Sequence, residues 1–211
     1  MLLYESTTKT AQNLVDEAEI LLKDTSNAIW SEAELLQALK QVIRKLYPDI
    51  FTPVTDTSLS TSGTTFDYTL PSTLDLILAV EVRDGSDTTD AFGGVRFHTE
   101  WNGTNNILRL FNLYGAALTI KLRGGKRLSV PTALSSTLDM SVDTEDLVLT
   151  GMKIEAMEMV LLDKGKLNQF AAREQGVTET DVQNMIAKLE RDYRKRKDEV
   201  ATMLIAQVTR I

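Results

Sequence analysis

The sequence predicts an α+β fold in which a helical bundle carries an antiparallel β-sheet or sandwich as an insertion. Apolar residues recur at helical spacing in both end regions, whereas short stretches of the middle region alternate polar and apolar residues. Thr, Ser, Gly and Asp separate these stretches, as turns separate strands. We expect an N-terminal helical hairpin at 1–50, a β insertion at 51–142, and C-terminal helices with a tail at 143–211 that complete one discontinuous helical domain.

Composition narrows the function classes before any motif is considered. The 211 residues are 43% hydrophobic, which suits one domain of ordinary size or a domain with a sizeable insertion. The chain has no cysteine, which excludes disulfides, thiolate metal sites and cysteine nucleophiles. We expect no signal peptide, because MLLYESTTKTAQ has no basic region followed by a long apolar run, and no membrane span, because no run of about 18 apolar residues occurs. The net charge of −7 argues against a protein that mainly grips duplex DNA, yet suits one that lines a DNA conduit.

The N-terminal region predicts two amphipathic helices joined by a short polar turn. The first, at 8–24, gathers its apolar residues on one face: Leu14, Val15, Ala18, Leu21 and Leu22. The second carries an apolar stripe over 35–46. Pro48 is expected to end it, because the residue before a proline disfavours the helical conformation.

The start of the second helix is marked by a capping box. Ser31 and Glu34 have the spacing at which each side chain satisfies a free backbone amide of the first turn. Trp30 and Leu35 flank this box as a hydrophobic staple, which fixes the angle at which the chain enters the helix.

The middle region predicts an antiparallel meander or small sandwich of about five strands. One strand alternates apolar with polar residues, at Phe66, Tyr68 and Leu70. The segment LILAVEV at 76–82 suits a pleated, half-buried surface. Asn102 and Gly103 predict a type I′ hairpin turn between VRFHTEW and ILRLF. A further strand, ALTIKLR, is expected to end at Gly124 and Gly125.

Two more helices are predicted after residue 143. Asp143 or Thr144 can cap the first, and its segment 147–165 is apolar on most sides, which predicts a central, buried helix. Thr178 and Asp181 form a second capping box, for a helix at 178–206 that spans roughly 43 Å at ~1.5 Å per residue. A small core does not cover that length from one side, so part of this helix is expected to meet other subunits.

No catalytic, cofactor-binding or metal-binding residue is expected. The one histidine, His98, lies in a predicted strand, and we interpret it as a surface or satisfied residue because no partner of a catalytic base accompanies it. Gly124 and Gly125 precede Lys126 and Arg127 but lack the other residues of a phosphate loop, so a hairpin turn is expected.

Two charged segments remain as candidate sites. The loop DGSDTTD spaces three carboxylates, Asp84, Asp87 and Asp90, without the order of a calcium-binding loop, so we expect a polar turn. The run RDYRKRKDE at 191–199 supplies five cations on a predicted helix: Arg191, Arg194, Lys195, Arg196 and Lys197. It is either a solvated face with internal pairs such as Glu190 with Arg194, or a docking surface for an acidic neighbour or DNA.

Three segments resemble the head-to-tail connector, or adaptor, proteins of tailed bacteriophages and related gene-transfer particles. W-S-E-A-E-L-L at 30–36 resembles the "sdaeLl" helix start common in that family. FDYTLPSTLDLILAVEV at 66–82 resembles its "y-x-L-P" strand, which a polar turn and a second strand follow. The long charged helix near the C-terminus, with its short apolar tail IAQVTRI, is the third. Together these segments extend over nearly the whole chain.

The resemblance implies a structural protein with no enzymatic activity and no cofactor. Such proteins form a ring homo-oligomer, here expected to be a dodecamer, beneath the portal protein. The ring extends the channel through which genomic DNA passes without sequence-specific binding, and it presents a surface to the next neck or tail protein. It implies a place in the neck of the virion, after synthesis in the host cytoplasm, and no membrane partner.

By position, the resemblance implies that residues 191–211 face the portal or a neighbouring subunit. The expected interface residues are the five cations and the apolar residues that follow them: Arg191, Arg194, Lys195, Arg196, Lys197, Val200, Met203, Leu204, Ile205, Val208 and Ile211.

Three other functions stay open. A nucleic-acid-binding module would use the cations at 191–197, and its binding would weaken with salt. An enzyme would need an unrecognised carboxylate site, for instance Asp84, Asp87 and Asp90. A different neck or tail component, such as a stopper or tail terminator, is the nearest alternative, because such proteins are also small ring formers.

Overall fold

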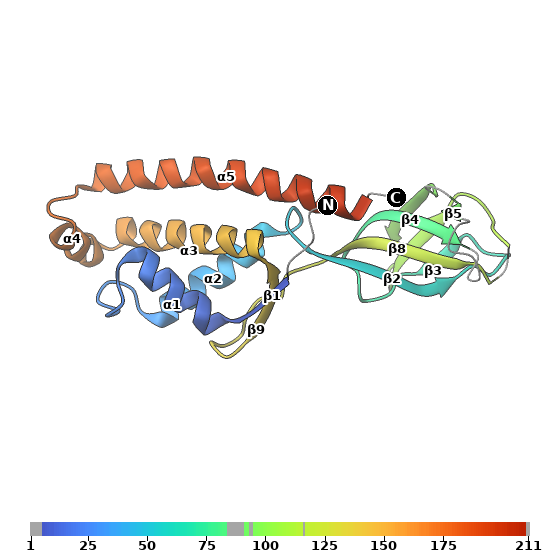
Figure 1. Cartoon of the computed structure of the whole chain (residues 1–211), viewed down its shortest axis with the longest axis horizontal. Helices are drawn as coiled ribbons and strands as arrows, with labels where there is room; N and C mark the ends of the chain where they lie inside the picture. The colour runs from blue at the N-terminus through green and yellow to red at the C-terminus, as the bar shows by residue number, and fades with distance from the viewer. Residues whose placement is uncertain (1–5, 84–90, 93–94, 116, 210–211) are drawn as a thin grey trace. The chain divides into compact units, whose positions relative to one another are not determined.

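The computed structural model describes residues 6–83, 91–92, 95–115 and 117–209. The described residues form five helices and three antiparallel sheets, which confirms the predicted α+β class (Figure 1). The chain divides into two compact units. The helical unit comprises the chain up to residue 50 and residues 128–201, whereas the β unit comprises residues 51–127 and the chain from 202 onward.

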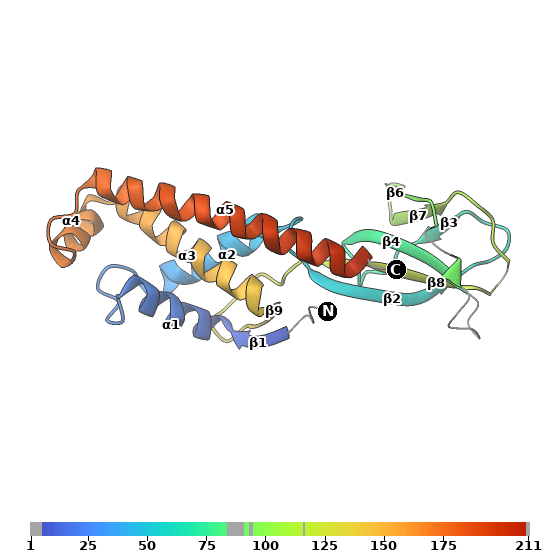
Figure 2. The ribbon, with the colours of Figure 1, turned by 45° about the horizontal axis from the view of Figure 1, so that its top comes forward.

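The helical unit is built around α3. Its helices are α1 (Ala11–Leu22), α2 (Glu32–Leu46), α3 (Val142–Leu162), α4 (Lys164–Arg173) and most of α5 (Glu179–Thr209). Within this unit, α3 lies between α5 on one side and the α1–α2 pair on the other (Figures 1 and 2). Its buried residues lie around most of its circumference, as the sequence predicted: Leu147, Val148, Leu149, Met152, Ile154, Ala156, Met157 and Val160.

The first helix starts later than predicted because a strand precedes it. β1 (Ser6–Thr10) pairs antiparallel with β9 (Thr137–Ser141), and Thr10 then caps α1. The Oγ1 of Thr10 accepts a hydrogen bond from the amide of Asn13 at 3.2 Å. The expected apolar face is buried at Leu14, Val15, Ala18 and Leu22 but not at Leu21, which is 46% exposed.

The start of α2 agrees with the sequence prediction. Glu34 accepts from the Ser31 amide at 2.9 Å, and the Glu34 amide donates to the Ser31 hydroxyl at 3.4 Å. Trp30 and Leu35, the predicted staple, are both fully buried. The helix ends at Leu46, before Pro48, as expected.

The two later helices differ in how well their starts were predicted. The cap of α3 is Ser141, whose hydroxyl accepts from the Thr144 amide at 3.1 Å, so the expected caps Asp143 and Thr144 lie inside the helix. The predicted cap of α5 is confirmed, since the Thr178 amide donates to Asp181 at 2.9 Å and the Asp181 amide donates back to the Thr178 hydroxyl at 3.3 Å.

The β unit contains two sheets that share one apolar core. The strands of the first are ordered β2 (Thr52–Ser60), β8 (Thr119–Lys126), β4 (Leu76–Arg83) and β5 (Ala91–Phe92). Those of the second are ordered β3 (Asp67–Thr69), β7 (Asn106–Leu110) and β6 (Phe97–Trp101). Both sheets contribute to the core: Tyr68, Val80, Val82, Leu108, Leu110, Ile120 and Leu122.

Gly124 and Gly125 do not form the predicted turn but lie buried inside β8. A Cβ on Gly124 would lie 1.8 Å from the carbonyl oxygen of Leu76, and one on Gly125 would lie 2.2 Å from the ring of Phe51. The glycines are therefore needed for close strand packing rather than for a positive φ.

The predicted hairpin exists, but its turn is not type I′. β6 and β7 pair from Phe97 with Leu110 to Trp101 with Asn106, which leaves a four-residue loop at 102–105. Only Gly103 has a positive φ in this loop (93°), whereas type I′ requires it at both central positions. The side chain of Asn102 instead accepts from the amides of Thr104 and Asn105, at 3.0 and 2.8 Å.

The boundaries between the helical unit and the β unit differ from those expected from the sequence. We expected the β insertion at 51–142, but residues from 128 onward, with β9, group with the helical unit because β9 pairs with β1. The last residues of α5, from 202, group with the β unit instead of the helices.

None of the helices in the described part of the chain combines the length and apolarity needed to cross a bilayer.

Candidate assembly surfaces

Three of the five predicted interface cations form ion pairs within the helical unit. Arg196 pairs with Asp143 at the start of α3, and the Nζ of Lys197 lies 2.7 Å from Asp49 after α2. Arg194 pairs with Glu190 one turn earlier at 3.1 Å, as the sequence predicted. Arg196 and Lys197 therefore fix α5 against the rest of the unit, and they are less available for a partner than the sequence indicated.

The other two predicted cations, Arg191 and Lys195, are exposed on α5. Of the apolar interface candidates, Val200, Leu204 and Val208 are buried in the chain itself, and Met203 is half-buried. Ile205 is 44% exposed. Ile211 lies outside the described residues. The exposed part of the predicted surface is thus a cationic stretch followed by one large apolar side chain.

A pocket of about 190 Å³ lies where α5 packs against α2 and α3. Gly151 permits the close approach of α2 to α3, because a Cβ there would lie 2.7 Å from the side chain of Val42, whereas its distance of 3.5 Å from the ring of Tyr193 would be an ordinary contact. Burial raises the pKa of Tyr193 to about 12, with a smaller contribution from the charge of Glu155. Burial also raises the pKa of Glu158, and Glu155 adds to that shift. Lys45, which pairs with Glu155, supplies the opposing charge.

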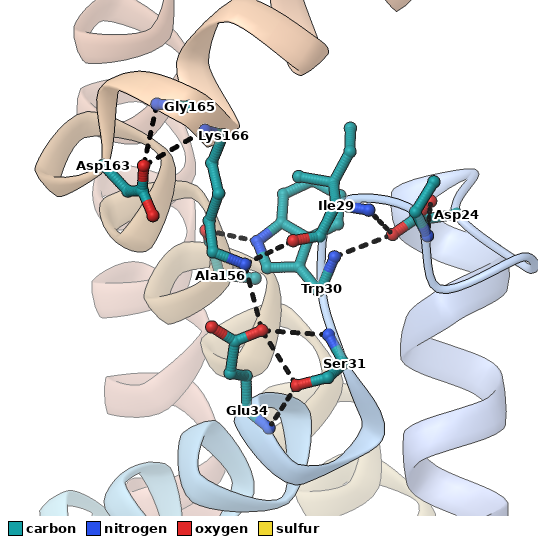
Figure 3. Close-up of polar contacts among 10 residues, drawn as sticks. Asp24, Ile29, Trp30, Ser31, Glu34, Ala156, Asp163, Gly165 and Lys166 are labelled. Carbon is teal, nitrogen blue, oxygen red and sulfur yellow. Dashed lines mark hydrogen bonds and ion pairs between the residues drawn. The ribbon is translucent and has the colours of Figure 1, made fainter.

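The turn between α1 and α2 is held to α3 and α4 by a cluster that Figure 3 shows. Asp24 accepts from the backbone amides of Ala28, Ile29 and Trp30, at 3.1, 2.9 and 2.9 Å. The indole N–H of Trp30 donates to the carbonyl oxygen of Ala156 on α3 at 2.8 Å. The conformation of the turn is therefore fixed by the carboxylate of Asp24, and its position against α3 is fixed by the buried ring of Trp30.

Helix α4 contacts this turn through two cations, of which Figure 3 shows Lys166. The Nζ of Lys166 donates to the carbonyl oxygen of Ile29 and to Glu34, the latter at 2.9 Å. The guanidinium of Arg173 lies 5.6 Å from the ring centroid of Trp30 and 5.0 Å from that of Phe170. Burial alone would raise the pKa of Glu34, but hydrogen bonds from Ser31 and Lys166 lower it overall.

In the β unit, aromatic side chains lie on the surface beside an ion pair. Phe66 and Phe111 line an open pocket of about 340 Å³. Asp67 and Arg109 of the same pocket form a bidentate ion pair, with both hydrogen bonds at 2.7 Å. The hydrogen bonds and charge of Arg109 lower the pKa of Asp67. Trp101, at the end of β6, is 63% exposed. Exposed aromatic rings of this kind are typical of contact surfaces. The sequence placed Phe66 in an alternating strand, but it lies just before β3 and is 43% exposed, and the exposure of Phe111 and Trp101 was not predicted.

The four-stranded sheet buries a charged cluster that the sequence analysis also missed. Glu81 on β4 is fully buried, with its carboxylate oxygens 2.6 Å from Arg83 and 2.8 Å from Arg123. These contacts are ion pairs whose angles fall outside hydrogen-bond geometry. Lys121 lies opposite Glu81 in the register, and burial, with the charge of Arg123, lowers its pKa. The alternation of charges along β4 and β8, at 81 and 83 and at 121 and 123, was the available signal.

The remaining candidate residues are not brought together into a site. His98 is exposed on β6, in agreement with its interpretation as a surface residue. Asp84, Asp87 and Asp90 lie outside the described residues. Within the described ranges, no three His, Asp or Glu side chains cluster closely enough to hold a metal ion.

Comparison of the chain with protein-family models found no matching family, and a comparison with curated proteins found no match either.

Proposed function

We propose that the chain is a structural head-to-tail connector of a tailed bacteriophage, an adaptor that forms a ring beneath the portal protein and joins the capsid to the tail. Genomic DNA passes through this ring without sequence-specific binding. A second surface of the ring binds the next neck or tail protein. The protein works in the neck of the virion, by fitting against other subunits rather than by catalysis.

The observation that carries this proposal is the discontinuous helical unit. Two helices before residue 50 and two after residue 162 pack together with α3, and a separate β unit is inserted in the chain between α2 and α3. This is the arrangement that the resemblance to connector proteins implies. The segment 30–36 contains the cap and first turn of α2, and the segment 66–82 includes β3 and most of β4.

The end of α5 around Ile205, beyond the exposed cations at 191 and 195, is the surface proposed to bind the portal. A simple way to remove this surface would be to delete residues 200–211. That deletion would also remove the buried residues Val200, Leu204 and Val208, so it would damage the fold as well as the surface. Substitution of Ile205, which is 44% exposed, changes the surface alone. Leu113 in the β unit is similarly exposed and provides a matched control.

The proposal is tested by co-sedimentation of the purified chain with rings of the portal protein from the same phage genome. We expect the wild-type chain and Leu113→Asp to sediment with the rings, and Ile205→Asp to lose at least tenfold in affinity. If the wild-type chain stays in the supernatant although it is folded, the adaptor proposal fails. Binding that Ile205→Asp leaves unchanged would retain the adaptor and refute the assignment of its portal surface.

A further inference from the structure

We propose that the exposed faces of α1 and α5, on opposite sides of the helical unit, bind each other between neighbouring copies of this chain. The inference rests on the proposed ring and names its subunit contact. The occupant of each face is thus a second copy of the same protein.

The α5 face is a basic stripe with an apolar residue at one end. Met185, Lys188, Arg191 and Lys195 recur at spacings of three and four, so they lie on one side of the helix. The three cations are exposed, and Met185 is 42% exposed. The stripe spans about 15 Å at ~1.5 Å per residue. Asp192 lies beside it, so three cations less one carboxylate leave a formal charge of +2.

The opposite face, at the end of α1 and the start of α2, is acidic and apolar. Ile20 is 64% exposed and Leu21 46% exposed. The exposed residues Asp16 and Glu32 with Lys23 give two carboxylates less one cation, a formal charge of −1, and the carboxylate of buried Glu19 lies close to them. Burial raises the pKa of Glu19. The negative charges of Asp16 and Glu32 raise this pKa further, as expected for an acidic surface.

The two faces are complementary in charge, and each includes exposed apolar side chains. An apolar centre with charged groups around it is the usual arrangement of a protein–protein contact, in which the charges set the register of the partners. Figures 1 and 2 both show α1 and α5 separated by α3, so the two faces of one chain do not meet. Contact between two different faces repeats from copy to copy and generates a ring when the rotation closes.

The absence of cysteine from the sequence permits a direct test by cross-linking. Ile20→Cys and Met185→Cys chains are mixed in equal amounts under mild oxidation, both free at high concentration and bound to portal rings. We expect a disulfide-linked dimer from the mixture in at least one condition, and at least tenfold less from either variant alone. The control replaces Met185→Cys by Leu162→Cys, a residue that is 87% exposed, and should give only the background yield.

Charge reversal identifies the interaction that aligns the two faces. Adding Lys188→Glu and Lys195→Glu to the Met185→Cys chain should reduce cross-linking at least fivefold, and adding Asp16→Lys and Glu32→Lys to the Ile20→Cys chain should restore it. The inference is overturned if the Leu162→Cys control cross-links equally well, or if no cross-link forms in either condition. Ring formation on the portal without the cross-link refutes this contact and leaves the adaptor proposal standing. Loss of DNA binding on charge reversal, without any cross-link, would assign the stripe to DNA and also refute the contact.

Discussion

Each unit of the molecule buries a carboxylate almost completely, Asp24 in the helical unit and Glu81 in the β unit, and the two are stabilised by different partners. Asp24 accepts hydrogen bonds from three backbone amides of the turn that follows it. Glu81 lies between two guanidinium groups, one on its own strand and one, Arg123, on β8. The first carboxylate takes its hydrogen bonds from its own turn and has one long ion pair outside it, with Arg173 at 3.9 Å, whereas the second depends on the assembled sheet for Arg123.

This difference predicts that the two units lose different amounts of stability when the buried carboxylate is separated from its partners. A one-residue slip between β4 and β8 would turn the cations of β8 away from Glu81, because side chains alternate between the faces of a sheet. The buried charge of Glu81 therefore selects one register of the β unit. Asp24 mainly fixes the conformation of its own turn, in a unit whose helices also pack through the buried apolar residues of α3.

The largest effect is expected from Glu81→Ala. The substitution leaves Arg83 and Arg123 without their buried counter-charge, which typically costs about 3–5 kcal/mol. The measurement is denaturant unfolding together with hydrogen exchange of the β4 and β8 amides. Combining Glu81→Leu with Arg83→Met and Arg123→Met should recover most of the loss, since it removes all three charges. A loss below about 1 kcal/mol for Glu81→Ala would show that the cluster does not stabilise the sheet.

A smaller effect, about 2 kcal/mol, is expected from Asp24→Ala, because water can replace part of the lost acceptor in a turn near the surface. Buried Trp30 is the natural reporter, since its amide donates to Asp24. Its fluorescence is best followed in a Trp101→Phe background, which removes the other tryptophan. Asp24→Asn should fall between wild type and Asp24→Ala. Equal losses for Asp24→Ala and Glu81→Ala would remove the proposed distinction between local and assembled partners.

The smallest effect is a gain, from Glu158→Gln in the pocket beside α5. The folded protein raises the pKa of Glu158, so the ionised form opposes folding at pH 7 and protonation favours folding as the pH falls. Glutamine removes that cost, and solvent screening keeps the gain at about 0.5 kcal/mol or less. The gain should disappear below the pKa of glutamate in the unfolded chain, near 4.3. Unfolding curves at pH 7 and pH 3.5 measure it, and a gain that grows in acid would contradict the assignment.

The sequence was sufficient where a structural signal is local. Ser31 with Glu34, and Thr178 with Asp181, define helix starts within one turn, and both pairs form as predicted. β1 was missed because its pairing partner, β9, lies far along the chain. Gly124 was assigned to a turn because the reason for a glycine there, the backbone of Leu76, is a contact between strands.

The same limit applies to the candidate assembly surface. Sequence spacing predicted the pair of Glu190 with Arg194, which lie one turn apart. It did not predict that Asp143 and Asp49, from distant segments, would engage Arg196 and Lys197. The acidic face of α1 was also missed, because an exposed leucine or isoleucine in an amphipathic pattern is recognised only when the helix has been packed.

The central claim is most directly tested by electron microscopy of portal rings incubated with the purified chain. We expect an added ring of density beneath the portal, with the end of α5 directed toward it and the α1 face of each copy against the α5 face of the next. Portal rings without added density, in the presence of a folded chain, would contradict the account and shift the assignment to another neck or tail component.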